Sequence, residues 1–246
     1  FLAAPGVYNN REPGGCVAQR EMQDSFRLRG QMFVAEEDSR THLEDTFYRD
    51  AMGLYDVRDS IITLKRDFAR VLCEDIYAWW IDQHAEGGRY RHEAIYRLFA
   101  RQKEIAEFSY GLNRVKNNEI ALIYDQESCH TVSAYTNMMM LDYYRTSDLH
   151  RIGAPVDYYF HNDLEREDMP DYKLYIMMNL FRLTDAEREA VLQKARKNGA
   201  VVLWLYAPGF LNPDAEHIMD NANIENLIGM HVGRIDRTCS PRFKIT

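Results

Sequence analysis

The stretch that decides the fold runs from Gly30 to Leu43 and reads GQMFVAEEDSRTHL. Its first part, Met32 to Ala35, is a short apolar run of the kind that forms a strand buried on both faces of a parallel sheet. The run ends in three carboxylates, Glu36 to Asp38, with an arginine and a histidine close behind. In parallel α/β proteins, reactive groups gather where strands leave the sheet. We therefore predict a buried strand with a candidate catalytic site at its end, the alternative being an acidic loop that caps the next helix.

The residues that follow repeat this pattern. Apolar residues recur at helical spacing from Ile61 to Leu72, with charged residues on the other face. A second apolar run, Ile76 to Ile81, again ends in polar residues beginning with Asp82, and another amphipathic helix is expected around residues 95–105. Strands that alternate with helices in this way predict a parallel sheet joined by helical crossovers.

A second α/β alternation begins after a polar linker at residues 113–118. Thr184 and Glu187 form a capping-box pattern at the start of a helix, and Gly199 is suited to end that helix in a left-handed conformation. The pattern predicts a doubly wound unit of the flavodoxin-like type. Its expected strands are residues 120–124, 156–160, 173–178 and 201–206, the last of them buried, and its expected helices are residues 133–151 and 184–198.

Composition limits the classes of function. The 246 residues carry a net charge of −8, which argues against nucleic acid as a partner because phosphate binding needs a cationic surface. No apolar run approaches the roughly 20 residues that span a bilayer, so no membrane partner is expected. The four cysteines are scattered, match no zinc spacing and suit a reducing, cytoplasmic setting as free thiols. Neither a metal nor a cofactor is expected.

Two classes of function fit these residues. The first is an enzyme in which Glu36 attacks a glycosidic carbon, because a carboxylate can form a glycosyl ester that water later cleaves. Trp79 or Trp80 could supply a flat apolar face for a sugar ring, and Arg40 or His42 could keep Glu36 ionised. The second class is a non-catalytic oligomerisation or carbohydrate-binding module whose acidic loops are only solvated.

A nucleophilic cysteine in the second unit, as in glutamine amidotransferases, is the third idea that the pattern raises. Such a cysteine sits at a sharp strand-to-helix turn. The expected strand 201–206 is instead followed by Ala207-Pro208-Gly209, and Cys129 lies in a poor position for a nucleophile. We therefore reject this idea.

Several motifs resemble the closing part of a β-galactosidase-like barrel, as in glycoside hydrolase family 42 and allied bacterial enzymes of the same clan. The first-half motifs are YNNREPG at residues 8–14, EEDSRTH at residues 36–42 and WWID at residues 79–82. The second-half motifs, which resemble the trimerisation domain of those enzymes, are GAPVDY at residues 153–158, PDYK at residues 170–173 and VLWLYAPG at residues 202–209. The resemblance covers nearly the whole chain.

The resemblance implies the C-terminal part of a (β/α)8 barrel at residues 1–112, the linker at 113–118, and a flavodoxin-like (class I glutamine amidotransferase-like) trimerisation domain at 119–246. It implies retaining hydrolysis of terminal β-galactosides, with Glu36 as the nucleophile and a homotrimeric assembly. Trp80 falls near the aromatic residue that lines the sugar site, with Trp79 as the alternative register. The acid/base glutamate of the family belongs to an earlier strand and has no counterpart here, so we expect the isolated chain to be inactive. The residues expected to contact the sugar are Tyr8, Arg11, Arg40, His42, Trp79, Trp80 and Asp82.

Overall fold

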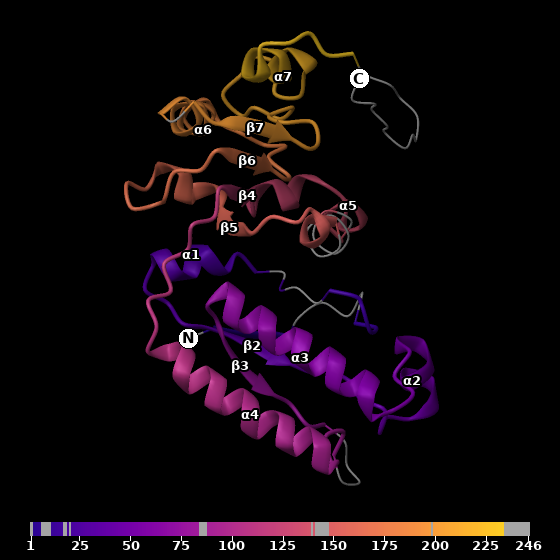
Figure 1. Cartoon of the computed structure of the whole chain (residues 1–246). Coiled ribbons are helices and arrows are strands. Elements are labelled where there is room, and N and C mark those ends of the chain that lie inside the picture. Colours follow the sequence, from indigo (N-terminus) through magenta and orange to yellow (C-terminus); the bar gives the residue numbers. More distant parts are fainter. Residues whose placement is uncertain are drawn as a thin grey trace.

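A computed structural model describes residues 2–5, 11–16, 19, 21–83, 88–138, 140, 148–197 and 199–233 of the chain. The fold is mixed α/β with two parallel sheets, which confirms the α/β class (Figure 1). The three-stranded sheet lies in the first half of the sequence and the four-stranded sheet in the second half.

The first sheet has the strand order β1-β2-β3, and all its strands are parallel. Helices α3 and α4 lie side by side across it, in front of β2 and β3 in Figure 1. The cluster that joins α3 to the sheet contains Phe33 and Ala35 from β2, and Val71 from α3. The elements of this half are β1 (Leu2–Pro5), α1 (Gln23–Leu28), β2 (Phe33–Glu37), α2 (Thr46–Met52), α3 (Val57–Glu74), β3 (Tyr77–Trp80) and α4 (Glu93–Tyr110).

Local sequence sets the ends of α3. Asp56 and Asp59 form a capping box, in which each side chain accepts a hydrogen bond from the other's backbone N–H. At the other end Asp75 takes a left-handed conformation with φ of 55°, which stops the helix and turns the chain into β3. The strand and helix predictions for this half are confirmed, although β2 extends two residues further than the apolar run and includes Glu36 and Glu37.

The second sheet has the strand order β5-β4-β6-β7, again all parallel. Each face of the sheet carries its own core: Ala121, Ile123 and Tyr175 pack on one side, and Leu122 and Ile176 on the other. The elements of this half are β4 (Ile120–Tyr124), η1 (Glu127–Thr131), α5 (Ala134–Met138), η3 (Leu149–Arg151), β5 (Val156–Phe160), η4 (His161–Glu165), β6 (Leu174–Met177), α6 (Asp185–Lys197), β7 (Val201–Trp204) and α7 (Asn221–Ile228).

The predicted ends of the helix at residues 184–198 are confirmed, while the helix expected at residues 133–151 is described only in part. The capping box is confirmed, since Thr184 N donates to Glu187 Oε2 at 2.7 Å and Glu187 N to Thr184 Oγ1 at 3.3 Å. Gly199 has a φ of 60°, as the left-handed cap requires. Within the expected helix 133–151, the structure describes α5 and η3, while residue 139 and residues 141–147 lie outside the described part.

The prediction of a buried strand at residues 201–206 is wrong. The strand itself forms as β7, but Val201 is 64% and Leu203 44% exposed. In the described chain β7 pairs only with β6, so it is an edge strand. An apolar run alone does not separate a central strand from an edge strand, because both read as the same short stretch of β-branched and aromatic residues.

Charged and polar side chains join the two halves. Asp24 of α1 accepts a hydrogen bond from the backbone N–H of Tyr158 at 2.7 Å, and Lys116 Nζ lies 2.9 Å from Asp24 and 3.0 Å from Asp157. Burial raises the pKa of Asp24, and the neighbouring Lys116 opposes that shift. Helix α1 therefore belongs to the first half in sequence but is anchored to β5 of the second sheet. The division into domains at 1–112, 113–118 and 119–246 stays a prediction.

Candidate functional site

The end of β2 divides its two glutamates between the two faces of the sheet. Glu37 points toward the helices, where it is only 1% exposed and forms an ion pair with Arg70 of α3. Because side chains alternate along a strand, Glu36 points to the opposite face. The structure thus places these two adjacent carboxylates on opposite faces of the sheet.

Glu37 is a structural carboxylate. Burial raises the pKa of Glu37 to about 6, and the attraction of Arg70 opposes this shift. The pKa of Arg70 is raised: its burial works against the charge, and the surrounding carboxylates, led by Glu37, outweigh that effect. Arg70 also lies 2.9 Å from Glu74 on its own helix. The ion pair therefore ties the end of β2 to α3.

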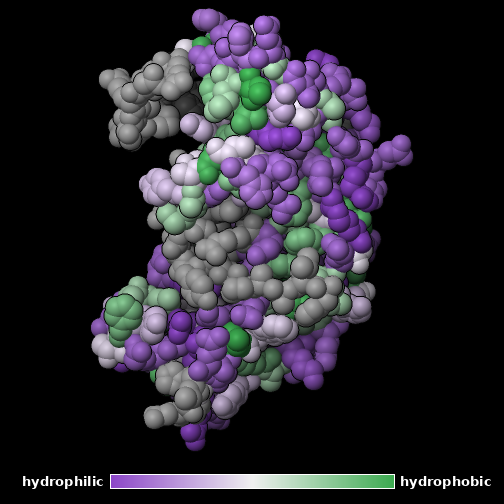
Figure 2. Space-filling view, turned by 180° about the vertical axis from the view of Figure 1, so that it is seen from behind, coloured by the Kyte–Doolittle hydropathy of each residue, from purple (hydrophilic) through white to green (hydrophobic). Residues whose placement is uncertain are grey.

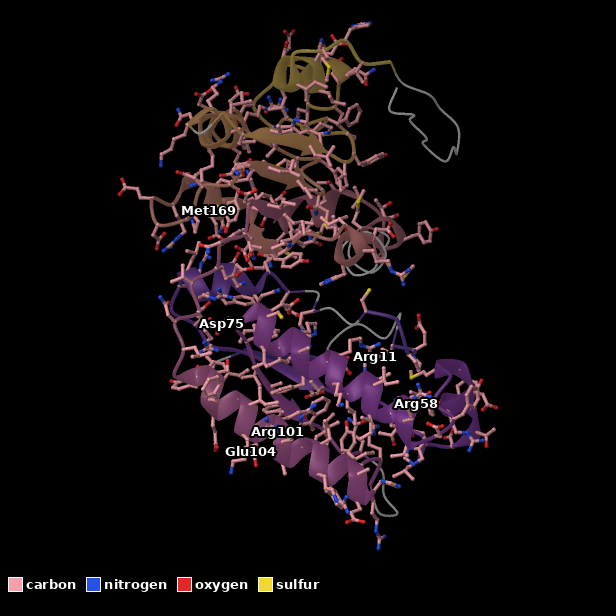
Figure 3. The ribbon with its side chains drawn as sticks, in the orientation of Figure 1. Arg11, Arg58, Asp75, Arg101, Glu104 and Met169 are labelled. Carbon is pink, nitrogen blue, oxygen red and sulfur yellow. The ribbon has the colours of Figure 1, made fainter. Side chains whose placement is uncertain are left out.

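Asp38, the next residue, is held by two arginines. Arg11 donates to the backbone oxygen of Asp38 at 2.9 Å, and Arg89 donates to the same oxygen at 3.1 Å. Arg89 Nη1 also lies 3.1 Å from the Asp38 carboxylate, and Arg89 Nε lies 3.0 Å from Glu44. All four side chains are less than 10% exposed. This network fixes the path of the chain immediately after β2, and Arg11, which Figure 3 labels, is one of its members rather than a free ligand contact.

Arg40 and His42 lie further along the same loop and turn toward helices. Arg40 pairs with Glu44 at 3.3 Å and lies over the ring of Tyr48, 4.3 Å from its centroid. The ring of His42 contacts Ser60 Oγ through Nδ1 at 2.9 Å and packs edge-on against His92. Partial burial, followed by the neighbouring His92, lowers the pKa of His42. Neither side chain forms an ion pair or hydrogen bond with Glu36 in the described part of the chain, so the expectation that one of them keeps Glu36 ionised is not met.

Glu36 is half-buried and makes no hydrogen bond or ion pair with any described residue. Its register partners are Pro5 on β1 and Trp79 on β3. Glu36 is therefore the acidic side chain at the end of the central strand that is not committed to the packing of α3. A carboxylate that is not held in an ion pair or hydrogen bond can attack a substrate, as a nucleophile must.

The two tryptophans lie on opposite faces of the sheet. Trp80 stacks on Phe99 of α4 with a centroid distance of 5.0 Å and packs in the cluster formed by Leu64, Ile95 and other helix residues. It belongs to the helix side of the sheet. Trp79, 42% exposed, shares the face of Glu36 and is its register partner across the β2–β3 pair.

The remaining predicted site residues are dispersed. Asp82 accepts a hydrogen bond from the backbone N–H of Arg89 at 2.8 Å, so it shapes the loop after β3. Tyr8 lies outside the described residues. Of the predicted set, Glu36 and Trp79 are the pair that the strand register brings together, while Arg11, Arg40, His42 and Trp80 are engaged in packing and ion pairs elsewhere.

Sequence reasoning missed a second polar cluster at the ends of the strands of the second sheet. Asn179 bridges β6 and β4: its Oδ1 accepts from Asp125 N and its Nδ2 donates to Asp125 O, both at 2.7 Å. His161, directly after β5, places Nδ1 3.7 Å from the carboxylate of Asp125. Each residue follows a strand closely, so the rule applied to β2 could have found them. Burial tends to raise the pKa of Asp125, but hydrogen bonds from His161 and Ser128 lower it overall.

This cluster does not provide a nucleophile. Burial raises the pKa of the Cys129 thiol, and its sulfur lies 2.7 Å from the hydroxyl of Tyr124. The thiolate is the reactive form of cysteine, so a raised pKa suppresses attack at neutral pH. The rejection of Cys129 as a nucleophile therefore agrees with its surroundings.

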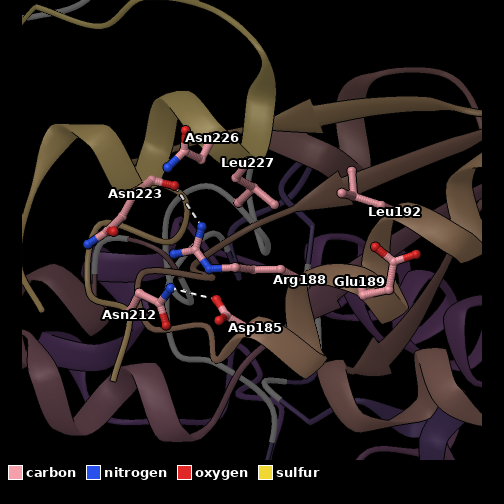
Figure 4. Close-up of a pocket in the computed structure, with 8 residues that line it drawn as sticks. All are labelled: Asp185, Arg188, Glu189, Leu192, Asn212, Asn223, Asn226 and Leu227. Atoms are coloured by element: carbon pink, nitrogen blue, oxygen red, sulfur yellow. Dashed lines mark hydrogen bonds between the residues drawn. The ribbon is translucent and has the colours of Figure 1, made fainter. Parts of the chain in front are cut away.

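A polar cavity of about 240 Å³ lies between α6 and α7 (Figure 4). Its central residue, Arg188, donates to the backbone oxygens of Leu183, Asn223 and Gly209 at 3.2, 2.6 and 2.5 Å. Gly209 has a φ of 62°, and a Cβ there would come within 2.7 Å of Arg188. The guanidinium is committed to holding three backbone segments together, which is a structural role.

Among the residues that the structure describes, no group of three or more histidine, cysteine, aspartate or glutamate side chains could hold a metal ion. Over the same residues, no helix is both long enough and apolar enough to cross a membrane.

Comparisons with known proteins leave the family open. No protein-family model matches the chain, and no curated protein matches it. Among solved structures, the chain is similar to the crystal structure of beta-galactosidase from Bifidobacterium adolescentis, with a TM-score of 0.35 and 18% sequence identity. The match covers 47% of this chain and 56% of that chain, so this chain spans little more than half of that structure's length. A likeness of this size is too weak to assign a family or an activity.

The opposite placement of Glu36 and Glu37 gives a matched pair of variants. We expect Glu37→Ala to lower the free energy of unfolding by about 3–5 kcal/mol, because it leaves Arg70 buried without its main partner. Glu36→Ala removes no described contact and should change the free energy of unfolding by less than about 0.5 kcal/mol. Urea denaturation of both variants at pH 7 measures this. Equal destabilisation by the two substitutions would contradict the assignment of the faces.

Proposed function

We propose that this chain is part of a retaining glycoside hydrolase of the β-galactosidase type, in which Glu36 is the nucleophile. The observation that carries the proposal is the placement of Glu36 at the end of the central strand of three parallel strands, on the face away from α3 and α4, beside Trp79 and without a described partner. A glycosyl ester forms on such a carboxylate, and the neighbouring indole offers a flat apolar surface to the sugar ring.

The arrangement of strands supports the (β/α)8 barrel as the scaffold. Crossover helices on one face of parallel strands, and reactive groups at the strands' C-terminal ends, are features of such barrels. The second sheet supports a flavodoxin-like unit, because its order β5-β4-β6-β7 places the first strand in sequence between the second and the third. The choice of terminal β-galactosides as substrates rests on the motif resemblance described above.

Retaining hydrolysis needs a second carboxyl group about 5–5.5 Å from the nucleophile to protonate the leaving oxygen. Among the described carboxylates near the end of β2, Glu37, Asp38 and Glu44 are all buried in ion pairs with arginines. We propose that the acid/base residue is not supplied by this chain. General acid assistance is worth about 10²–10⁴-fold, so the chain alone should not cleave ordinary aryl glycosides at a useful rate.

An activated substrate tests the nucleophile separately from the acid. In 2,4-dinitrophenyl 2-deoxy-2-fluoro-β-galactoside the leaving group departs without protonation, and the fluorine slows hydrolysis of the ester. We expect slow formation of one covalent sugar adduct, mapped by peptide mass spectrometry to Glu36 and absent from the Glu36→Gln variant. The Glu37→Gln variant, assayed at a temperature at which circular dichroism shows it to be folded, serves as the neighbouring control and should still be labelled. Labelling at another carboxylate, or none at Glu36 after prolonged incubation, would contradict the proposal.

The exposed face of β7 favours a second role, self-association through the second half of the chain. Val201 and Leu203 of β7 are 64% and 44% exposed, and Leu205, directly after the strand, is 38% exposed. Alternation places Val201 and Leu203 on one face of the sheet, and Leu205 continues their spacing. Figure 2 shows one face of the molecule, on which hydrophilic residues dominate among the coloured atoms and hydrophobic residues form small separate groups. We propose that the β7 surface, defined by these three residues, mediates a closed assembly, with a homotrimer as the expected state.

Light scattering at micromolar concentration tests the β7 surface. We expect the molar mass of a trimer for the wild-type chain. Leu203→Glu should dissociate the trimer, because a charge would be buried in an apolar contact. Ile62→Glu on α3 is the matched control, since Ile62 is 43% exposed but lies in the first half. A monomeric wild-type chain, or dissociation by both variants alike, would contradict this role.

A further inference from the structure

Tyr90 lies between β3 and α4 in the sequence and is a buried side chain, only 5% exposed. Its hydroxyl donates to the backbone oxygen of Ser39 at 3.0 Å and also reaches that of Glu37, at 3.3 Å. Both oxygens belong to the segment in which the chain leaves β2, the strand that carries Glu36. Tyr90 therefore connects the loop after β3 to the end of the neighbouring strand.

The residue before Tyr90 extends this contact. Arg89 donates to the backbone oxygen of Asp38 at 3.1 Å. Asp38 and Ser39 lie beyond the end of β2, so their backbone groups need partners outside the strand ladder. Arg89 and Tyr90 together bind the backbone oxygens of three successive residues, Glu37 to Ser39. Two adjacent side chains thus fix the path of the chain immediately after Glu36.

The ring of Tyr90 contacts the other strand of the candidate site. It packs edge-on against Trp80 of β3 with a centroid distance of 6.2 Å, and both belong to one cluster on the helix side of the sheet. Trp80 is the register partner of Glu37. The preceding register pair, Trp79 and Glu36, points to the opposite face. A single side chain therefore contacts the ends of both strands directly behind the pair of candidate site residues.

The hydroxyl of Tyr90 keeps its proton. Burial raises the pKa of Tyr90, and the attraction of the Arg89 guanidinium opposes this shift without cancelling it. An ordinary tyrosine already ionises only near pH 10, so the O–H of Tyr90 is a hydrogen-bond donor throughout the neutral range. The contact with the end of β2 is therefore not lost by titration.

We propose that Tyr90 is a positioning residue, which holds the carboxylate of Glu36 in place beside Trp79. The inference rests on the proposed function, because it gives Tyr90 a part in the attack by Glu36. Tyr90 itself does not contact the sugar and acts through the backbone that carries the nucleophile. Attack requires the reacting atoms to lie about 3–3.5 Å apart in the bound complex, so a small displacement of the carboxylate slows it strongly.

The Tyr90→Phe variant removes the hydroxyl and keeps the ring that packs on Trp80. We expect the adduct of Glu36 with 2,4-dinitrophenyl 2-deoxy-2-fluoro-β-galactoside to form about ten- to a hundredfold more slowly than in the wild-type chain. Tyr172→Phe is the matched control. It removes a buried hydroxyl of the second half, which donates to Asp157 at 2.8 Å, and should leave the rate unchanged. All chains are assayed at a temperature at which circular dichroism shows them to be folded.

Modification by a water-soluble carbodiimide separates positioning from a loosened fold. This reagent needs an accessible carboxylate but no sugar aligned with it. In Tyr90→Phe we expect Glu36 to be modified at the wild-type rate, while Glu37 stays protected by its pair with Arg70. Slower formation of the sugar adduct together with this unchanged pattern is the result that a positioning role predicts.

The outcomes distinguish this inference from the proposed function. A wild-type chain that is not labelled at Glu36 would overturn the proposed function and the role of Tyr90 with it. If the wild-type chain is labelled, three results would overturn the role of Tyr90 alone: an unchanged adduct rate in Tyr90→Phe, an equal loss in Tyr172→Phe, or new modification of Glu37 in Tyr90→Phe.

Discussion

The ion pair between Glu37 and Arg70 is the contact on which the rest of the candidate site depends. Because successive side chains of a strand point to opposite faces, the face of one residue sets the face of all the others. Glu37 is buried against α3, so Glu36 must face away from the helices. A slip of one residue would bury Glu36 beside Arg70 and expose Phe33 and Ala35, which now pack in the core. Electrostatics and apolar packing thus specify the same register.

The alternation of strands and helices could be predicted from the sequence, but the hydrogen-bond and ion-pair partners of individual polar residues could not. Apolar periodicity located β2, α3 and β4, because burial of a face or stripe is a local property of the pattern. Arg11 and Arg40 looked like candidate ligand contacts, yet Arg11 bonds to Asp38, 27 positions away, and Arg40 pairs with Glu44. The sequence alone does not show which carboxylate or carbonyl group each arginine contacts. The same limit explains why Arg89, a central member of the network, was missed.

The faces of Trp79 and Trp80 and the exposure of β7 could not be read from the sequence for the same reason. Trp79 and Trp80 are chemically identical neighbours, and only the packing of Trp80 against Phe99 shows which one faces the helices. Val201 and Leu203 form an apolar run like that of a central strand, but the described sheet ends at β7 and leaves them exposed. In both cases the deciding information lies in neighbours that are distant in sequence. The candidate site is therefore smaller than the sequence suggested, with Glu36 and Trp79 at its centre.

Carboxylate footprinting of the folded chain tests the opposite placement of Glu36 and Glu37. A water-soluble carbodiimide with glycine ethyl ester modifies accessible carboxylates, and fragmentation of the peptide that contains β2 separates Glu36 from Glu37. We expect Glu36 to be modified in the native chain, and Glu37 to be modified only after denaturant has broken its pair with Arg70. Modification of Glu37 in the native chain, with Glu36 protected, would contradict the assignment of the faces and with it the proposed nucleophile.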